Sequence, residues 1–178
     1  MKKYVKLLPL ILYPYAYLLW IIFMVVTQDT VIEEISEQMD LGMGIYGIIF
    51  VVYNIYVIFI SIYHAVTTAR NDSPAKEAAR TNLVIKSVQI PAYIFHFIMG
   101  VIGFCMGIWG IGFLLVAVLV DVLTISFTGI SAIGCGIKMK KEGHMSTGAA
   151  VVASIGSFLF CIDIFVALFY VVKSRKKN

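Results

Sequence analysis

Residues 87–137, SVQIPAYIFHFIMGVIGFCMGIWGIGFLLVAVLVDVLTISFTGISAIGCGI, decide the fold, because these 51 residues contain a single charged side chain, Asp121. As one helix rising 1.5 Å per residue, they would be roughly 75 Å long, far more than the ~30 Å hydrocarbon core of a bilayer. The stretch must therefore cross a membrane and turn back. Its glycine-rich centre, residues 107–112, is the predicted turn, which gives predicted spans at about 87–108 and 111–137.

Three further stretches are also long and apolar. Residues 7–28 and 41–69 have no charged side chain, and residues 143–172 have one, Asp163. A transmembrane helix needs about 20 apolar residues, so each stretch can cross once. The predicted spans are about 7–27, 42–67 and 147–172.

The composition excludes a soluble globular protein. The chain has 61% hydrophobic and 13% charged residues and a mean hydropathy of +0.94, whereas soluble domains have about 25% charged residues. We therefore expect one all-α membrane domain over residues 1–178, a polytopic bundle of five transmembrane helices joined by short loops.

The basic residues predict the orientation of this bundle. They precede the first span, separate the second from the third, and separate the fourth from the fifth: Lys2, Lys3, Lys6; Arg70, Lys76, Arg80, Lys86; Lys138, Lys140, Lys141. In a five-span chain all of them lie on one side. By the positive-inside rule this is the cytoplasmic side of a bacterial-type cell membrane, with the N-terminus in the cytoplasm. The acidic segment 28–41 then lies outside, where residues 31–40 predict a short amphipathic surface helix.

The C-terminal tail is the exception to this pattern. Its four basic residues, within residues 173–177, lie outside in a five-span chain. In a four-span alternative, residues 87–137 cross once and form a re-entrant loop, which returns the tail to the cytoplasm but exports the lysines of residues 138–141. The two arrangements place nearly equal numbers of basic residues inside, and the length of residues 87–137 favours five spans.

Local signals predict where some helices begin and bend. The lysine-rich start followed by a long apolar run predicts a retained signal anchor. Pro14 predicts a kink in the first span, because proline removes a backbone donor. Ser73 before Pro74 predicts a capped start for a short surface helix over residues 74–82. The three cysteines are an odd number within apolar segments, which argues against a disulfide framework.

Asp121 and Asp163 are the acids inside predicted spans. Each lies 21 positions from residue 142, the centre of the predicted loop between the last two spans, so in an antiparallel hairpin their carboxylates would reach one depth. Asn54 reaches a similar level, and Thr124 lies one turn from Asp121. Two close carboxylates would share a proton or bind a cation. These four residues are the candidate proton, cation or cationic-substrate site; alternatively, a protonated carboxyl pair acts as interhelical glue.

A stripe of small residues is the second feature. His96, Gly100, Gly103, Gly107 and Gly110 follow one another at spacings of four, three, four and three, which places them on one helical face. Small residues let helices approach closely in lipid, so the predicted role is helix packing. Alternatively, the glycines line a channel or a sliding surface with His96 in its cytoplasmic half.

The sequence has no HExxH, GxSxG or P-loop motif, and nothing in it calls for a cofactor or a metal. We therefore expect a non-enzymatic accessory or interaction protein that contacts the lipid bilayer, forms a homo-oligomer or joins a larger membrane complex, and binds no nucleic acid. The alternative is a small proton- or cation-coupled transporter or permease that uses Asp121 and Asp163. An intramembrane enzyme is the weakest interpretation, because no nucleophile, base and orienting group can be assembled.

Overall fold

The computed structural model describes residues 2–16, 18–19, 21–22 and 36–175. The predicted all-α class is confirmed, since every regular element among these residues is a helix. The elements are α1 (Lys2–Leu12), η1 (Tyr13–Tyr15), α3 (Ser36–Arg70), α4 (Ala75–Cys105), η3 (Gly107–Gly110), α5 (Ile111–Lys141), α6 (Thr147–Gly156) and α7 (Ile162–Lys173).

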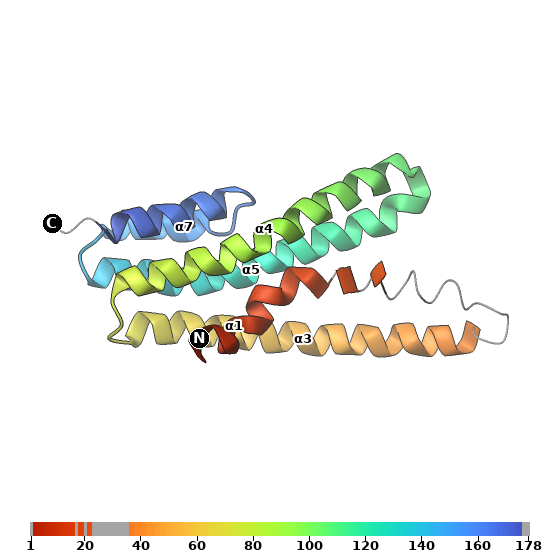
Figure 1. The fold of residues 1–178 in the computed structure, drawn as a ribbon, viewed down its shortest axis with the longest axis horizontal. Coiled ribbons are helices and arrows are strands. Elements are labelled where there is room, and N and C mark those ends of the chain that lie inside the picture. The colour runs from red at the N-terminus through yellow and green to blue at the C-terminus, as the bar shows by residue number, and fades with distance from the viewer. Residues whose placement is uncertain (1, 17, 20, 23–35, 176–178) are drawn as a thin grey trace.

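Three of the described helices are long and apolar enough to cross a membrane: Gly47–Arg70 within α3, α4 and α5. They lie side by side as the body of the molecule (Figure 1). The chain turns back through η3, in the glycine-rich stretch where the sequence predicts the turn. We call this end of the bundle the turn end. The opposite end is the loop end, where residues 71–74 join α3 to α4 and residues 142–146 join α5 to α6.

Helix α4 combines two elements that the sequence predicts as separate. The predicted surface helix over residues 74–82 is the first part of α4, which continues without interruption to Cys105. Pro74 is the N-cap in place of Ser73 and makes no side-chain cap bond. Instead, the Glu142 carboxylate accepts hydrogen bonds from the Ala75 N–H at 3.0 and 2.9 Å. A carboxylate at this position favours the helix because the N-terminus carries partial positive charge.

Helix α1 bends at the predicted proline. The α-helix gives way to η1 at Tyr13–Tyr15, around Pro14. Proline has no N–H to offer the carbonyl four residues earlier, and the Gln89 side chain of α4 supplies the missing donor to the Leu10 carbonyl at 3.0 Å. The Tyr53 hydroxyl of α3 donates to the Pro9 carbonyl at 2.7 Å. Both neighbouring helices therefore hold this bend in place.

The last predicted span is two short helices. α6 ends at Gly156, the chain reverses, and α7 runs back beside it, so the pair forms a helical hairpin (Figure 1). α6 packs on α5, whereas α7 packs on α4. With 10 and 12 residues, the two helices are about 15 and 18 Å long, roughly half of the hydrocarbon core. Neither helix is long enough to cross such a core alone, and the C-terminal end of α7 returns to the loop end.

The surroundings of Gly136 on α5 show the same reversal. A Cβ at Gly136 would lie 2.9 Å from the Tyr170 hydroxyl and 3.0 Å from the Ser154 hydroxyl. In one continuous helix, Ser154 and Tyr170 would be about 24 Å apart. The hairpin brings them to the same point of α5.

This arrangement differs from both predicted topologies. The residues that follow α5 lie at the loop end, as in the five-span prediction, and the end of α7 lies there too, as in the four-span prediction. The reason is that residues 147–172 are long enough for one full crossing or for two half crossings. Their length and hydropathy do not distinguish these alternatives.

The helices approach one another most closely at small residues. A Cβ at Gly134 on α5 would lie 2.3 Å from the Ala65 carbonyl oxygen on α3, so these two backbones are in direct contact. Near the loop end, alanines of α4, α5 and α6 pack around Met139 and Tyr170. Toward the middle of the bundle, α1 packs its Leu10 and Tyr13 against Phe127 of α5. The body of the protein is thus built from close helix crossings, as expected in lipid.

Half of one predicted element lies outside the described residues. The amphipathic surface helix over residues 31–40 includes residues 31–35, which the structure does not describe, and from Ser36 the chain already belongs to α3. The end of the predicted first span, residues 23–27, is also outside the described residues.

Candidate functional site

A line of buried polar side chains follows one face of α4. Its members are Asn82, Lys86, Gln89, Tyr93 and His96, at spacings of four, three, four and three, and all of them are buried. The line continues directly into Gly100 and Gly103, the first glycines of the predicted stripe. We call these five side chains the α4 polar line. Buried polar groups at membrane depth need partners within the protein, and those partners define the candidate site.

Lys86 is the basic partner of Asp163. Its Nζ lies 2.8 Å from Asp163 Oδ2, and both side chains are buried. The same ammonium donates to Thr128 Oγ1 at 3.0 Å and to the Ser157 carbonyl at 3.5 Å. Ser157 is the C-cap of α6 and Asp163 lies in the first turn of α7, so the charges of Lys86 and Asp163 suit the dipoles of the two hairpin helices.

His96 is the partner of Asp121. Its Nδ1 lies 2.5 Å from Asp121 Oδ1, and the Asp121 side chain is 18% exposed while His96 is buried. The pair lines a pocket of about 350 Å³ between α4 and α5, whose other walls include Phe97, Phe104 and Phe160. The pair thus places an imidazole and a carboxylate, both able to exchange a proton, at an apolar opening.

The four predicted site residues have four separate partners. Asp121 binds His96, Asp163 binds Lys86, Asn54 accepts a hydrogen bond from the Tyr13 hydroxyl at 2.6 Å, and Thr124 donates to the Val120 carbonyl of its own helix. Among the described residues, no hydrogen bond joins one of the four to another. Asn54 is therefore not the third member of an acid cluster. The assignment of Asp121 and Asp163 to a proton or cation site stays a prediction.

The two acids also lie at different depths. Their partners Lys86 and His96 are ten residues apart on α4, which corresponds to about 15 Å along the helix. Counting from residue 142 predicts one depth because it assumes a straight final span, whereas the hairpin carries Asp163 back toward the loop end. Tyr93 lies between Lys86 and His96 along α4, and its ring packs edge-on against Phe160.

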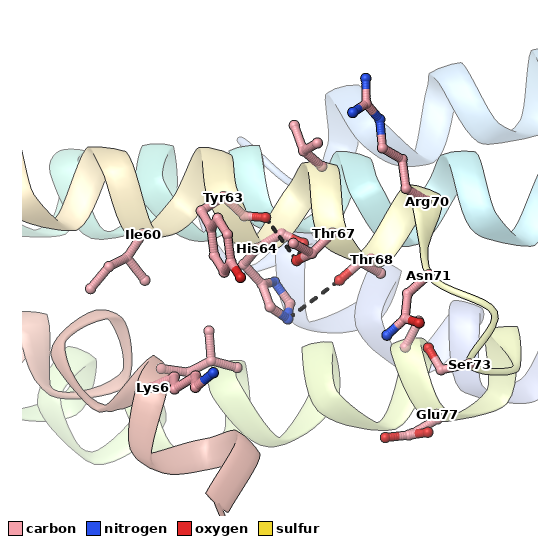
Figure 2. A pocket seen from close by; sticks show the side chains of 13 residues that line it. Lys6, Ile60, Tyr63, His64, Thr67, Thr68, Arg70, Asn71, Ser73 and Glu77 are labelled. Atoms are coloured by element: carbon pink, nitrogen blue, oxygen red, sulfur yellow. Dashed lines mark hydrogen bonds between the residues drawn. The ribbon is translucent and has the colours of Figure 1, made fainter.

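A second pocket opens near the loop end, between α1, α3 and α4 (Figure 2). Its volume is about 780 Å³. His64, buried in its wall, makes a 2.6 Å contact with Ser131 Oγ through Nδ1 and a 3.4 Å contact with Thr68 Oγ1 through Nε2. Each of the two buried histidines of the bundle therefore lines a pocket, one at each side of the Lys86–Asp163 pair.

The predicted stripe is divided between two elements, because α4 ends at Cys105: His96, Gly100 and Gly103 lie on α4, whereas Gly107 and Gly110 lie in the turn η3. The prediction of one helical face for all five residues is therefore wrong, but the glycines do pack within the chain. A Cβ at Gly100 would lie 3.4 Å from Leu114 Cδ1, and a Cβ at Gly103 would lie 2.8 Å from the Gly110 carbonyl oxygen. Gly110 itself leaves no room for a Cβ beside Gly103. Gly107 adopts a positive φ of 62° in the turn, which glycine tolerates. The stripe thus lets the beginning of α5 lie directly on the end of α4.

Among the described residues, no three His, Cys, Asp or Glu side chains gather as a metal site. Cys105, Cys135 and Cys161 are free thiols.

Apart from His96, the members of the α4 polar line were not predicted as site residues. Lys86 was counted among the loop bases, although the spacing of Asn82, Lys86, Gln89, Tyr93 and His96 continues the His96–Gly110 stripe backwards. Extending that stripe by nearly three turns, ten residues back from His96, would have shown a lysine inside a helix, on the same face as His96.

A comparison of the chain with protein-family models, with curated proteins and with solved structures finds no match.

Proposed function

We propose that the chain is a small, non-enzymatic integral membrane protein of a bacterial-type cell membrane that acts by associating with another polypeptide in the bilayer. The loop end would face the cytoplasm, because the basic residues gather there: Arg70, Lys138, Lys140, Lys141 and Lys173. The other polypeptide would be a second copy or a larger membrane partner.

The observation that carries this proposal is the tip of the α6–α7 hairpin. Residues 158–161 are exposed and non-helical, although the hairpin packs against α4 and α5 within their apolar length. Irregular backbone at membrane depth is tolerated where protein or a water-filled cavity covers it, and not where it faces lipid. The apolar side chains of Phe158, Leu159 and Phe160 suit a protein cover better than water.

Photocrosslinking in the native membrane tests this proposal. A photoreactive residue at Leu159 is expected to form an adduct with a protein, whose mass distinguishes a second copy from another subunit. The matched control is Val52, an apolar residue of α3 whose side chain is exposed, and lipid adducts are expected there. Lipid adducts at both positions, or rapid modification of Cys161 by a water-soluble thiol reagent, would contradict the proposal.

A second candidate function rests on the His96–Asp121 pair. This pair is titratable, lies within the membrane-spanning part of α4 and α5, and lines a pocket. Intramembrane ionisable residues commonly mark proton or ion pathways, so a proton-coupled transporter that uses Asp121 is the alternative. Proton uptake into proteoliposomes under an imposed pH gradient tests it. Uptake that is lost in Asp121→Asn supports the alternative, whereas uptake equal to that of empty liposomes removes it.

A further inference from the structure

The larger pocket has two chemically different regions. It extends along α3 from Ile60 to Asn71, a distance of about 16 Å. Toward the middle of the bundle its walls are apolar, with Leu7, Ile60 and Tyr63. Toward the loop end most of the lining residues are polar, although Val66 and Ala78 also line the pocket there. The polar residues are Thr67, Thr68, Arg70, Asn71, Ser73 and Glu77. Polarity therefore increases along the pocket in the direction of the loop end.

Charged side chains are a second feature of the pocket. Lys6 of α1 and Arg70 at the end of α3 contribute two positive charges against the one negative charge of Glu77. In Figure 2 Lys6 lies across from the His64 ring, near Ile60 and Tyr63, whereas the Arg70 side chain extends from the end of α3 on the side away from Lys6. Both basic side chains are exposed, so they can turn toward a ligand without breaking a buried contact. An anionic group at the rim would meet these cations and the hydroxyl groups of Thr67 and Thr68.

We propose that this pocket binds an anionic phospholipid, with the phosphate in the polar region, toward which the exposed Lys6 and Arg70 side chains can turn, and the glycerol and upper acyl chains against Leu7, Ile60 and Tyr63. Basic pockets between transmembrane helices at the cytoplasmic side are suited to acidic lipid headgroups. A free phosphate would contact only the polar region. A lipid would contact both regions, with its headgroup toward the loop end and its acyl chains toward the middle of the bundle, as in a bilayer. The apolar wall therefore favours the lipid over the free anion. This proposal does not depend on the partner association proposed above.

Native mass spectrometry of the full chain, released from detergent, measures the binding directly. The lipids are phosphatidylglycerol and, as the zwitterionic control, phosphatidylcholine; inorganic phosphate is added in a separate series. One phosphatidylglycerol per chain is expected to bind in preference to phosphatidylcholine. A juxtamembrane cation contributes roughly a fivefold gain in affinity for an acidic lipid, so Lys6→Gln with Arg70→Gln is expected to weaken the binding by roughly 25-fold.

Two further variants separate this pocket from general surface charge. Lys140 is an exposed base at the same end of the bundle that does not line the pocket, and Lys140→Gln is expected to leave the affinity within about twofold of wild type. Glu77→Gln removes the negative charge from the rim and is expected to strengthen binding.

Four results would overturn the proposal. The first two are equal binding of the two lipids and binding of inorganic phosphate as tight as that of phosphatidylglycerol. The other two are a loss of affinity in Lys140→Gln as large as in the Lys6→Gln, Arg70→Gln variant, and wild-type affinity in that folded double variant.

Discussion

Lys86 Nζ lies 2.8 Å from Asp163 Oδ2 inside the bundle, and this contact joins the middle of α4 to the first turn of α7. Because the same ammonium also binds Thr128 of α5 and the Ser157 carbonyl at the end of α6, one side chain holds the hairpin tip against both long helices. The pair explains how two charges remain at this depth, since each neutralises the other and the ammonium has three oxygen acceptors.

Removal of one partner should therefore cost much more than removal of both. Lys86→Met leaves the Asp163 carboxylate buried without its cation, and we expect a loss of about 3–5 kcal/mol in the free energy of unfolding. The double variant Lys86→Met, Asp163→Leu replaces the pair by apolar side chains and should recover most of that loss. Thermal melts in one detergent measure all three proteins. A single variant as stable as wild type would show that the pair does not hold the hairpin.

The contact between Gly134 and Ala65 predicts a second difference in stability. A methyl group at Gly134 would lie 2.3 Å from the Ala65 carbonyl oxygen, so Gly134→Ala must push α5 away from α3. Overpacking of this kind costs about 1–3 kcal/mol. The matched control is Gly112→Ala on the same helix, where a Cβ meets nothing within 4 Å and the better helix propensity of alanine should stabilise slightly. Equal melting temperatures of the two variants would contradict the close crossing.

Cys161 at the hairpin tip is predicted to store backbone strain. Its φ is 64° and its ψ is −36°, and the Phe160 carbonyl accepts a hydrogen bond from the Ile162 N–H at 2.8 Å, which makes a tight γ-turn. This conformation is rare and strained for a residue with a side chain. Cys161→Gly should therefore raise the free energy of unfolding by about 1 kcal/mol, while Cys161→Val should lower it. Urea titrations in mild detergent give the comparison, and the reverse order of the two variants would be incompatible with this turn.

Glu142 predicts an acid-sensitive component of stability at the loop end. Burial alone would raise the pKa of Glu142, but the hydrogen bond from the Ala75 N–H and the contact with Lys138 outweigh it, and the pKa falls below its ordinary value of 4.5. The folded state therefore favours the ionised carboxylate. The stabilisation is complete above about pH 4.5 and is lost as the pH falls through the lower pKa of the folded state. Glu142→Gln should melt at a lower temperature near pH 6 and show a weaker dependence on pH below 4.5. If the melting temperatures of wild type and Glu142→Gln fell equally with decreasing pH, Glu142 would not have this role.

Hydropathy and length predicted the long helices, because whether a stretch forms a long apolar helix depends mainly on the residues of that stretch. The turn at Gly107–Gly110 followed from the excessive length of residues 87–137, and the bend at Tyr13–Tyr15 followed from Pro14. The re-entrant hairpin could not be predicted in this way. The hairpin is packed through contacts between residues far apart in the sequence, such as that of Asp163 with Lys86, 77 positions away.

The candidate site was predicted only in part, because its acids can be recognised within one stretch of sequence but their partners cannot. Asp121 and Asp163 stand out because an acid within an apolar stretch is costly wherever it lies. Spacing places Lys86 on the same helical face as His96 but does not show that it is buried. Lys86 lies near polar residues in the sequence and becomes fully buried because α4 continues from Ala75 to Cys105. His96 was predicted to lie with the glycines on one helix-packing face, and its contact with the Asp121 carboxylate of the next helix was not predicted.

The central claim is that α6 and α7 form a re-entrant hairpin, so that the chain leaves the membrane on the side where residues 142–146 lie. Single-cysteine labelling with a membrane-impermeant maleimide, in a background without the three native cysteines, tests it most directly. Ser146→Cys reports the loop end, Ile108→Cys reports the turn end, and Arg175→Cys reports the end of α7. We expect Arg175→Cys to be labelled from the same side as Ser146→Cys and to be protected from the side that labels Ile108→Cys. Labelling of Arg175→Cys together with Ile108→Cys would show a full fifth crossing and contradict the hairpin.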